Sequence, residues 1–137
     1  MSFKKYIREM DESKFVSLSE CVFDLLIFTE QVHVWHLQTG SYAQHMALAD
    51  LYDGIPDIVD TIAEAMTGLN HKLTVPTKSF TLKNFNGISE VVSEINGYKD
   101  RATMMFKATG DVAGINNSLA DLISLFDKTV YKLTNLN

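Results

Sequence analysis

The 137-residue sequence contains one cysteine, two prolines and seven glycines, and each scarcity limits what the protein can be. The single cysteine, Cys21, cannot form an internal disulfide, so a disulfide-stapled secreted fold is excluded. Cys21 lies in an apolar run, which predicts a buried, unreactive thiol. The small number of prolines and glycines leaves room for long regular elements.

The sequence also lacks a long hydrophobic run and an excess of positive charge. No stretch approaches the roughly 20 apolar residues of a membrane span, and the charged N-terminus has no apolar signal core. The net charge is −5. The N-terminal basic residues are balanced by acidic neighbours: Lys4, Lys5, Arg8 and Lys14 against Glu9, Asp11 and Glu12. Phosphate binding needs unopposed cations, so we expect a cytoplasmic protein with neither a membrane nor a DNA partner.

Apolar residues recur at steps of three and four from about residue 13 to residue 39, which predicts an amphipathic helix. They are Phe15, Leu18, Val22, Leu25, Phe28, Val32 and Trp35. Gly40 is suited to a left-handed position at the end of this helix, and Ser41 to the N-cap of the next. Trp35 and Tyr42 are predicted to pack at the turn between the two helices.

A second periodic run covers about residues 42–69. Because Pro56 lies inside it, we predict one long helix kinked near Asp53. Residues 70–85 lack helical periodicity and indicate an extended connection. Two further helices follow at about residues 87–108 and 111–133, with Asp111 as the N-cap of the last.

Four helices with short, long and short connections form two antiparallel hairpins joined by one crossover. The predicted fold class is therefore all-α, a ferritin-like four-helix bundle with a single domain over residues 1–137.

The predicted second helix carries a polar stripe. Its members, within roughly 100° of arc, are His45, Asp53, Asp60 and Glu64. A polar stripe is most often a solvated face, but such faces mix charges of both signs. Between Ser41 and His71 the sequence has no lysine or arginine. Carboxylates without cations, beside a histidine, favour a divalent metal ion.

One possible site is split between two subunits. His45 and Asp60 are fifteen residues apart, about 22 Å of helix, so one subunit cannot place both on one ion. His36 lies near His45 across the turn, and His33 lies one turn further back. These histidines would meet Asp60 and Glu64 of a two-fold partner.

The alternative is a site inside the bundle. Its carboxylates would be Glu20 and Asp24, opposite Asp60 and Glu64, with Glu90 or Glu94 from the third helix. Ferritin-like di-iron sites use a Glu-x-x-His pair on each of two helices. Here that pattern occurs only at Glu30 and His33 on the first helix, so we rank the split site first.

Residues 32–68 resemble the Dps-type miniferritins. The matching features are Trp35-His36, Gly40, Tyr42, His45, Ile62-Ala63-Glu64 and the Asp60-x-x-x-Glu64 spacing. Asp60 follows His45 by fifteen residues, as in that family. Ala49 stands where the family has an aspartate, and His33 rather than His36 keeps the family spacing of twelve residues to His45.

The resemblance implies iron(II) oxidation and iron storage in a shell of twelve subunits built from two-fold dimers, with O₂ or peroxide as oxidant. His36, His45, Asp60 and Glu64 would bind the iron, and His33 and Asp53 are further candidates. The chain is also similar to small ferritin-like proteins of tailed phages, which implies the host cytoplasm. The alternative function is a non-enzymatic helical module that keeps the fold without the metal chemistry.

Overall fold

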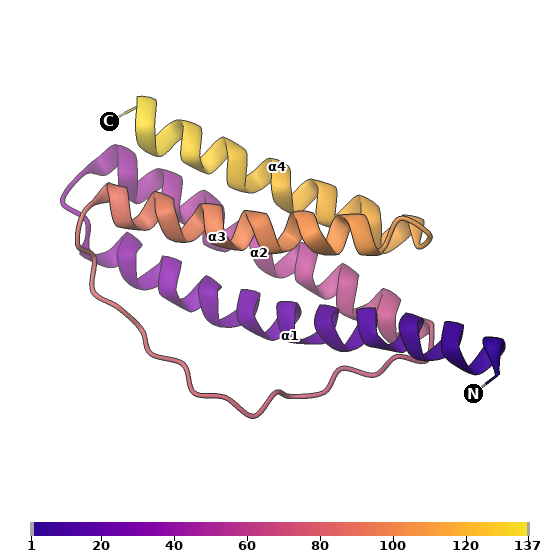
Figure 1. The fold of residues 1–137 in the computed structure, drawn as a ribbon. Helices are drawn as coiled ribbons and strands as arrows, with labels where there is room; N and C mark the ends of the chain where they lie inside the picture. Colours follow the sequence, from indigo (N-terminus) through magenta and orange to yellow (C-terminus); the bar gives the residue numbers. More distant parts are fainter. Residues whose placement is uncertain (1, 137) are drawn as a thin grey trace.

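The protein is a bundle of four α-helices in the computed structural model, which describes residues 2–136 (Figure 1). The helices are α1 (Phe3–Gln38), α2 (Tyr42–Gly68), α3 (Ile88–Ala108) and α4 (Ala113–Asn135). No strand occurs within residues 2–136, so the predicted all-α class is confirmed. α1 begins about ten residues earlier than predicted. The side chains of residues 3–12, which include three cations weighed for DNA binding, lie outside the described part.

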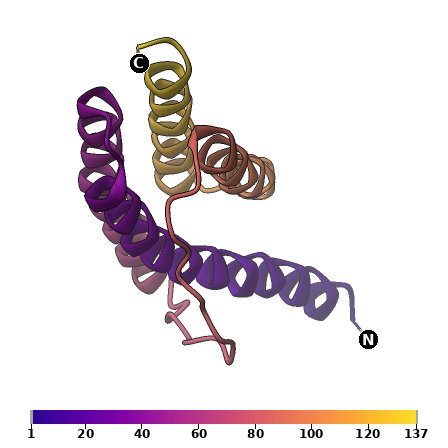
Figure 2. The same cartoon turned by 90° about the vertical axis from the view of Figure 1, so that its left-hand side faces the viewer.

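The helices form two hairpins, α1–α2 and α3–α4, each with a short turn (Figure 1). α1 packs on α2, α2 on α4 and α3 on α4, while α1 and α3 make a smaller contact. Residues 69–87 cross back along the length of the bundle, so α2 and α3 run in the same direction. Seen from the end, this crossover passes over the side of the bundle where α1 and α3 face each other (Figure 2). In the described part of the chain, no helix is both long and apolar enough to cross a membrane.

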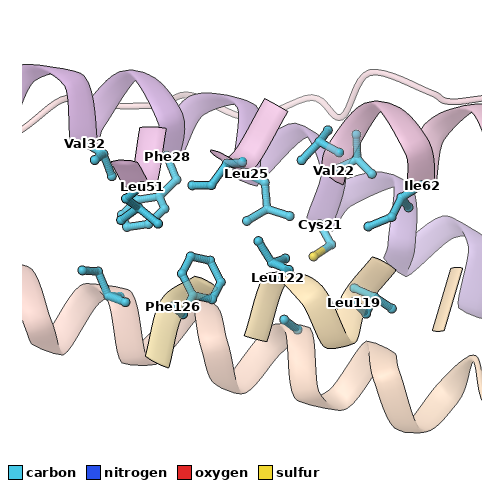
Figure 3. Packing of buried hydrophobic residues seen from close by; sticks show 14 of the residues in the cluster. Cys21, Val22, Leu25, Phe28, Val32, Leu51, Ile62, Leu119, Leu122 and Phe126 are labelled. Carbon is cyan, nitrogen blue, oxygen red and sulfur yellow. The ribbon is translucent and has the colours of Figure 1, made fainter. Parts of the chain in front are cut away.

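The core is built from apolar side chains of all four helices (Figure 3). All seven periodic residues predicted for α1 are buried, which confirms the interpretation of that pattern. Their main partners are Leu48, Leu51, Ile55 and Ile62 of α2, Val91 and Ile95 of α3, and Leu119, Leu122 and Phe126 of α4. Full burial of each such side chain contributes roughly 1.5–3 kcal/mol.

The turn between α1 and α2 is capped by a side chain, as predicted. Ser41 is the N-cap of α2, and its hydroxyl accepts a hydrogen bond from the Gln44 amide at 3.3 Å. Trp35 is buried and meets Phe28 edge-on, which confirms its packing role. The packing role predicted for Tyr42 is wrong, because its side chain is 78% exposed.

The left-handed conformation predicted for Gly40 is also wrong. Among the described residues, positive φ angles occur at Asn70 and Gly87 only. Thr39 closes the turn instead: its amide donates to the Trp35 carbonyl at 3.0 Å, and its hydroxyl accepts from the Ser41 amide at 3.2 Å. With these bonds made, the chain does not need a left-handed residue to end α1.

One further boundary differs from the sequence-based prediction. The N-cap of α4 is Val112 rather than Asp111, because the Asp111 carboxylate binds Lys14 of α1 at 2.8 Å instead. α2 is one continuous helix through Pro56, as predicted, while the kink near Asp53 stays a prediction. Cys21 is buried as predicted, and burial raises the pKa of its thiol to about 11.

Candidate functional site

Two histidines bind each other's backbone where α1 ends and α2 begins. The Nδ1 of His36 lies 2.7 Å from the His45 carbonyl oxygen, and the Nδ1 of His45 lies 2.9 Å from the His36 carbonyl oxygen. The two rings are stacked, with centroids 3.6 Å apart and planes 19° from parallel. The short turn of the antiparallel hairpin brings these residues together although nine positions separate them in sequence.

These bonds determine the tautomer of both rings. A carbonyl oxygen can only accept, so each Nδ1 must carry the hydrogen. In the neutral imidazole, Nε2 then holds the lone pair. Metal-binding histidines commonly have this arrangement, in which a carbonyl fixes Nδ1–H and orients the ring while Nε2 binds the ion.

A third histidine and a tyrosine extend the pair into an aromatic cluster. The ring of His33 stacks on Tyr52 with centroids 4.4 Å apart, and His36 meets the same tyrosine edge-on at 5.1 Å. His36 is buried, whereas His33, His45 and Tyr52 are half-buried. We name this group, His33, His36, His45 and Tyr52, the histidine cluster.

Sequence reasoning found three members of the histidine cluster and missed Tyr52. The signal was present, because Tyr52 follows His45 by seven residues and therefore lies on the same face of α2. The structure brings both candidate first-helix ligands, His33 and His36, to this end of the hairpin. Of these two residues, His36 is the one that stacks directly on His45.

The predicted carboxylate ligands lie elsewhere on the chain. Asp60 and Glu64 are exposed on α2, and Asp60 is about 22 Å along the helix from His45. Asp53 is exposed between them. Within the described residues, no group of three or more histidine, cysteine, aspartate or glutamate side chains could hold a metal ion. One subunit therefore assembles the imidazoles but not the carboxylates.

Two carboxylates of the site considered inside the bundle are paired with cations of the protein itself. Asp24 is buried and pairs with Lys78 at 2.5 Å and with Arg101. Glu94 pairs with Lys83 of the crossover. These carboxylates serve ion pairs that tie distant segments together, and the sequence interpretation did not anticipate their partners.

One carboxylate of α2 is also paired with a cation. Asp50 pairs with Lys132 of α4 at 3.0 Å, so a cation absent from α2 itself is supplied by another helix. The prediction of a metal ion, which was based on the absence of lysine and arginine from α2, therefore concerns only the other acids of this helix. Asp60 and Glu64 are among them.

The stacking of His36 and His45 limits how they can bind metal. The lone pair of Nε2 lies in the plane of its own ring, and these two planes are nearly parallel and 3.6 Å apart at their centroids. One ion cannot lie in both planes at a normal Fe–N or Zn–N distance of about 2.1 Å. The pair in this arrangement can serve two ions, one for each ring, or one ion on one ring.

Comparison with known proteins gives a family but no characterised relative. No curated protein and no solved structure matches the chain. One family model matches residues 36–133, a region that begins at His36, includes His45, Asp60 and Glu64, and leaves out His33. The chain therefore belongs to the family of unknown function DUF5856.

Proposed function

We propose that this protein is a miniferritin-like iron(II) oxidase and iron store whose sites are shared by two copies of the chain. The observation that carries the proposal is the reciprocal pair of His36 and His45. Both rings have Nδ1 fixed on a carbonyl, so both present Nε2 as a ligand. Imidazole suits iron(II), which is here a substrate and not a resident cofactor.

The parallel rings favour two iron ions over one. Two iron(II) ions release two electrons on oxidation to iron(III). With two protons, these electrons convert one hydrogen peroxide molecule into two water molecules, or one O₂ molecule into one hydrogen peroxide molecule. A pair of ligand rings, each directed to its own ion, therefore matches the stoichiometry of either oxidant.

The remaining ligands come from a second copy in this proposal. α2 is continuous, and the point midway between His45 and the Asp60–Glu64 pair falls close to Asp53. A two-fold axis that crosses α2 there brings His45 of one chain to Asp60 and Glu64 of the partner subunit. The exposure of both carboxylates supports this arrangement, because a second chain can reach them.

Larger features of the proposal rest on the resemblance to miniferritins. The bundle has two hairpins joined by a crossover, which is compatible with ferritin-like connectivity. The resemblance adds a shell of twelve subunits, assembled from two-fold dimers.

Aerobic iron(II) oxidation, followed by the absorbance of the iron(III) product, tests the function. We expect His45→Ala and Asp60→Ala each to slow oxidation at least about tenfold, the usual effect of losing a metal ligand or its support. His71→Ala and Asp121→Ala are the matched controls, since they remove a histidine and an exposed aspartate outside the proposed site. A wild-type rate no faster than buffer, with both O₂ and peroxide, would contradict the proposal.

A second candidate function, a non-enzymatic interaction module, is favoured by a different observation. Three apolar side chains are exposed around the α1–α2 turn: Leu37 at 70%, Tyr42 at 78% and Met46 at 43%. Exposed apolar groups that gather in one place often mark a protein contact. Iron content separates the two functions, because the interaction module would retain no more iron than Asp60→Ala after exposure to iron(II).

A further inference from the structure

A cavity of about 410 Å³ lies between α1, α3 and the crossover, away from the histidine cluster. Its apolar lining consists of Ile27 and Phe28 of α1, Phe80 and Leu82 of the crossover, and Gly97 and Tyr98 of α3. It lies on the side of the bundle where the crossover passes over α1 and α3, which make only a small contact with each other (Figure 2). Its volume is within the range of small-molecule sites.

The roof of the cavity is held in place by a buried side chain. Gln31 donates from its amide nitrogen to the Lys83 carbonyl at 2.9 Å and accepts from the Lys83 amide at 2.6 Å. Gln31 is only 5% exposed. The Lys83 ammonium pairs in turn with Glu94 of α3. The crossover is therefore attached to both helices at the point where it covers the cavity.

Gly97 keeps the cavity open. It lies in the middle of α3, where glycine costs roughly 0.8–1 kcal/mol relative to alanine. Its backbone does not require glycine, because its φ angle is not positive. A Cβ added there would meet nothing within 4 Å. Gly97 is exposed and belongs to the cavity lining, so a large side chain at this position would extend over the open side of the cavity.

One wall of the cavity is aromatic. Phe28 and Tyr98 stack with centroids 4.0 Å apart and planes 17° from parallel. Burial raises the pKa of the Tyr98 hydroxyl, so this wall stays uncharged near neutral pH. Phe80 and Leu82 add apolar surface from the crossover. Because Phe28 is only 1% exposed, the aromatic surface open to a ligand is that of Tyr98 and Phe80.

The charges beside the cavity present cations to solvent. The side chains of Lys83 and Arg101, both in the lining, are 55% and 44% exposed, and Lys78 nearby is 39% exposed. The carboxylates that pair with them are more buried, with Asp24 at 4% and Glu94 at 22%. An anionic group at the mouth would therefore meet the exposed ammonium and guanidinium groups before the carboxylates.

The geometry points to this cavity as a binding site for a small aromatic anion, with its ring against Phe80, Leu82 and Tyr98 and its carboxylate or sulfonate on Lys83 and Arg101. The site is independent of the iron chemistry proposed above. Its volume of about 410 Å³ suits a free small molecule.

Anilinonaphthalene sulfonate, a fluorescent aromatic anion, is a suitable probe. We expect one molecule to bind per folded chain, and its uncharged analogue phenylnaphthylamine to bind at least about fivefold more weakly, since it cannot use the cations. Gly97→Leu should weaken binding of the sulfonate at least about tenfold by filling the cavity. Gly114→Leu is the matched control, because a Cβ at Gly114 also meets nothing within 4 Å, and it should leave affinity within about twofold.

Charge variants give effects of opposite sign at the same site. Lys83→Met should weaken binding of the sulfonate, and Glu94→Gln should strengthen it by freeing Lys83. Backbone NMR shifts of the wild-type protein, on addition of the probe, should be largest at residues 80–83 and 94–101. Wild-type protein that does not bind the probe, Gly97→Leu that binds as wild type does, or NMR shifts centred elsewhere would each overturn the assignment. The NMR measurement decides the matter if Gly97→Leu does not fold.

Discussion

Leu125 of α4 fills the space that Gly54 of α2 leaves by having no side chain. A Cβ placed on Gly54 would lie 2.8 Å from Cδ2 of Leu125, closer than real side chains approach. Gly54 therefore sets how nearly α2 and α4 approach each other in the middle of the bundle. This contact explains a glycine in the interior of a helix, where it is locally unfavourable.

The Gly54–Leu125 contact predicts an unequal response of two helical glycines to the same substitution. Gly97→Ala should raise the free energy of unfolding by about 1 kcal/mol, because its Cβ enters open space. Gly54→Ala should be less stable than Gly97→Ala by about 1–2 kcal/mol, because Leu125 must move. Urea unfolding measures both values. In a Leu125→Ala background the difference should disappear, and strict additivity of the two changes would contradict the explanation.

The Cys21 thiol predicts a loss of stability in alkali. Its pKa is about 11 in the folded protein against 9.0 for the ordinary thiol, because burial disfavours the thiolate. The neutral thiol therefore stabilises the fold fully below about pH 9, and this contribution falls as the pH rises toward 11, by up to about 3 kcal/mol.

The Cys21→Ala variant tests this effect, since it removes the thiol and keeps every other titratable side chain. Urea unfolding at about pH 8 and about pH 10.5 should show a greater loss of stability for the wild type than for Cys21→Ala. Equal losses would contradict the assignment. Alkylation of the native thiol at about pH 8 should also be much slower than alkylation in urea.

A shared iron site predicts an oligomer with two-fold symmetry. Light scattering coupled to size exclusion should give at least a dimer, and a particle of twelve subunits if the resemblance to miniferritins extends to assembly. The concentration should be tens of micromolar, so that weak dimers are populated. A clean monomer under these conditions would contradict the shared site while leaving the cavity between α1 and α3 unaffected.

Subunit mixing tests which chain supplies which ligand. His45→Ala and Glu64→Ala should each be inactive alone. In a mixed dimer, one site combines both lesions and the other combines the intact His45 of one chain with the intact Glu64 of the partner subunit. Random reassembly makes half of the dimers mixed, so about a quarter of the wild-type oxidation rate should return.

The control for subunit mixing is a pair of variants from the same side of the site. His36→Ala and His45→Ala both damage the imidazole pair of one chain, so their mixed dimers should recover no activity. Particles must first be shown by mass spectrometry to contain both chains. Absence of recovery for His45→Ala with Glu64→Ala in such particles would place both residues in one subunit's site.

The periodic pattern in the sequence was sufficient to predict the helices and the α1 face of the core. Every apolar residue from Phe15 to Trp35 in that pattern is buried, because the 3.6-residue period directly reports which side of a helix faces inward. Ser41 was predictable as an N-cap for a similar reason, since its bond to the Gln44 amide is local.

What could not be predicted depends on partners far away in the chain. Asp111 was predicted to be a helix cap, but its carboxylate pairs with Lys14, which lies 97 positions away in the sequence. Asp24 was a candidate metal ligand, but its carboxylate pairs with Arg101, which lies 77 positions away in the sequence. The local sequence shows where a carboxylate is, whereas only the tertiary structure shows which cation pairs with it.

The candidate site also has one part that could be predicted from the sequence and one part that could not. The nine-residue separation of His36 and His45 spans one tight turn, so their proximity follows from the hairpin that the sequence predicts. Their mutual bonds to carbonyl oxygens require the two helix ends to meet at a particular angle, which periodicity does not specify. The relation of either histidine to Asp60 and Glu64 depends on a second chain and stays a prediction.

The crossover has a contour length well above the distance it must cover. Its nineteen residues, 69–87, can extend over about 65 Å, whereas the 27 residues of α2, whose length it must retrace, span about 40 Å. A shorter connection could join the two hairpins. The surplus chain is held along α1 at four positions, by Ser19 on Thr74, Asp24 on Lys78, Gln31 on Lys83 and Gln38 on Phe85.

The length of this segment is therefore set by what it covers rather than by what it connects. Between these contacts a change in the length of the chain need not move any helix, and the entropy of loop closure changes by only about 0.6 kcal/mol for each doubling of length. Such changes would alter the depth and the mouth of the cavity between α1 and α3. A bundle with this connectivity can thus vary one side pocket while its core and its helix ends stay the same.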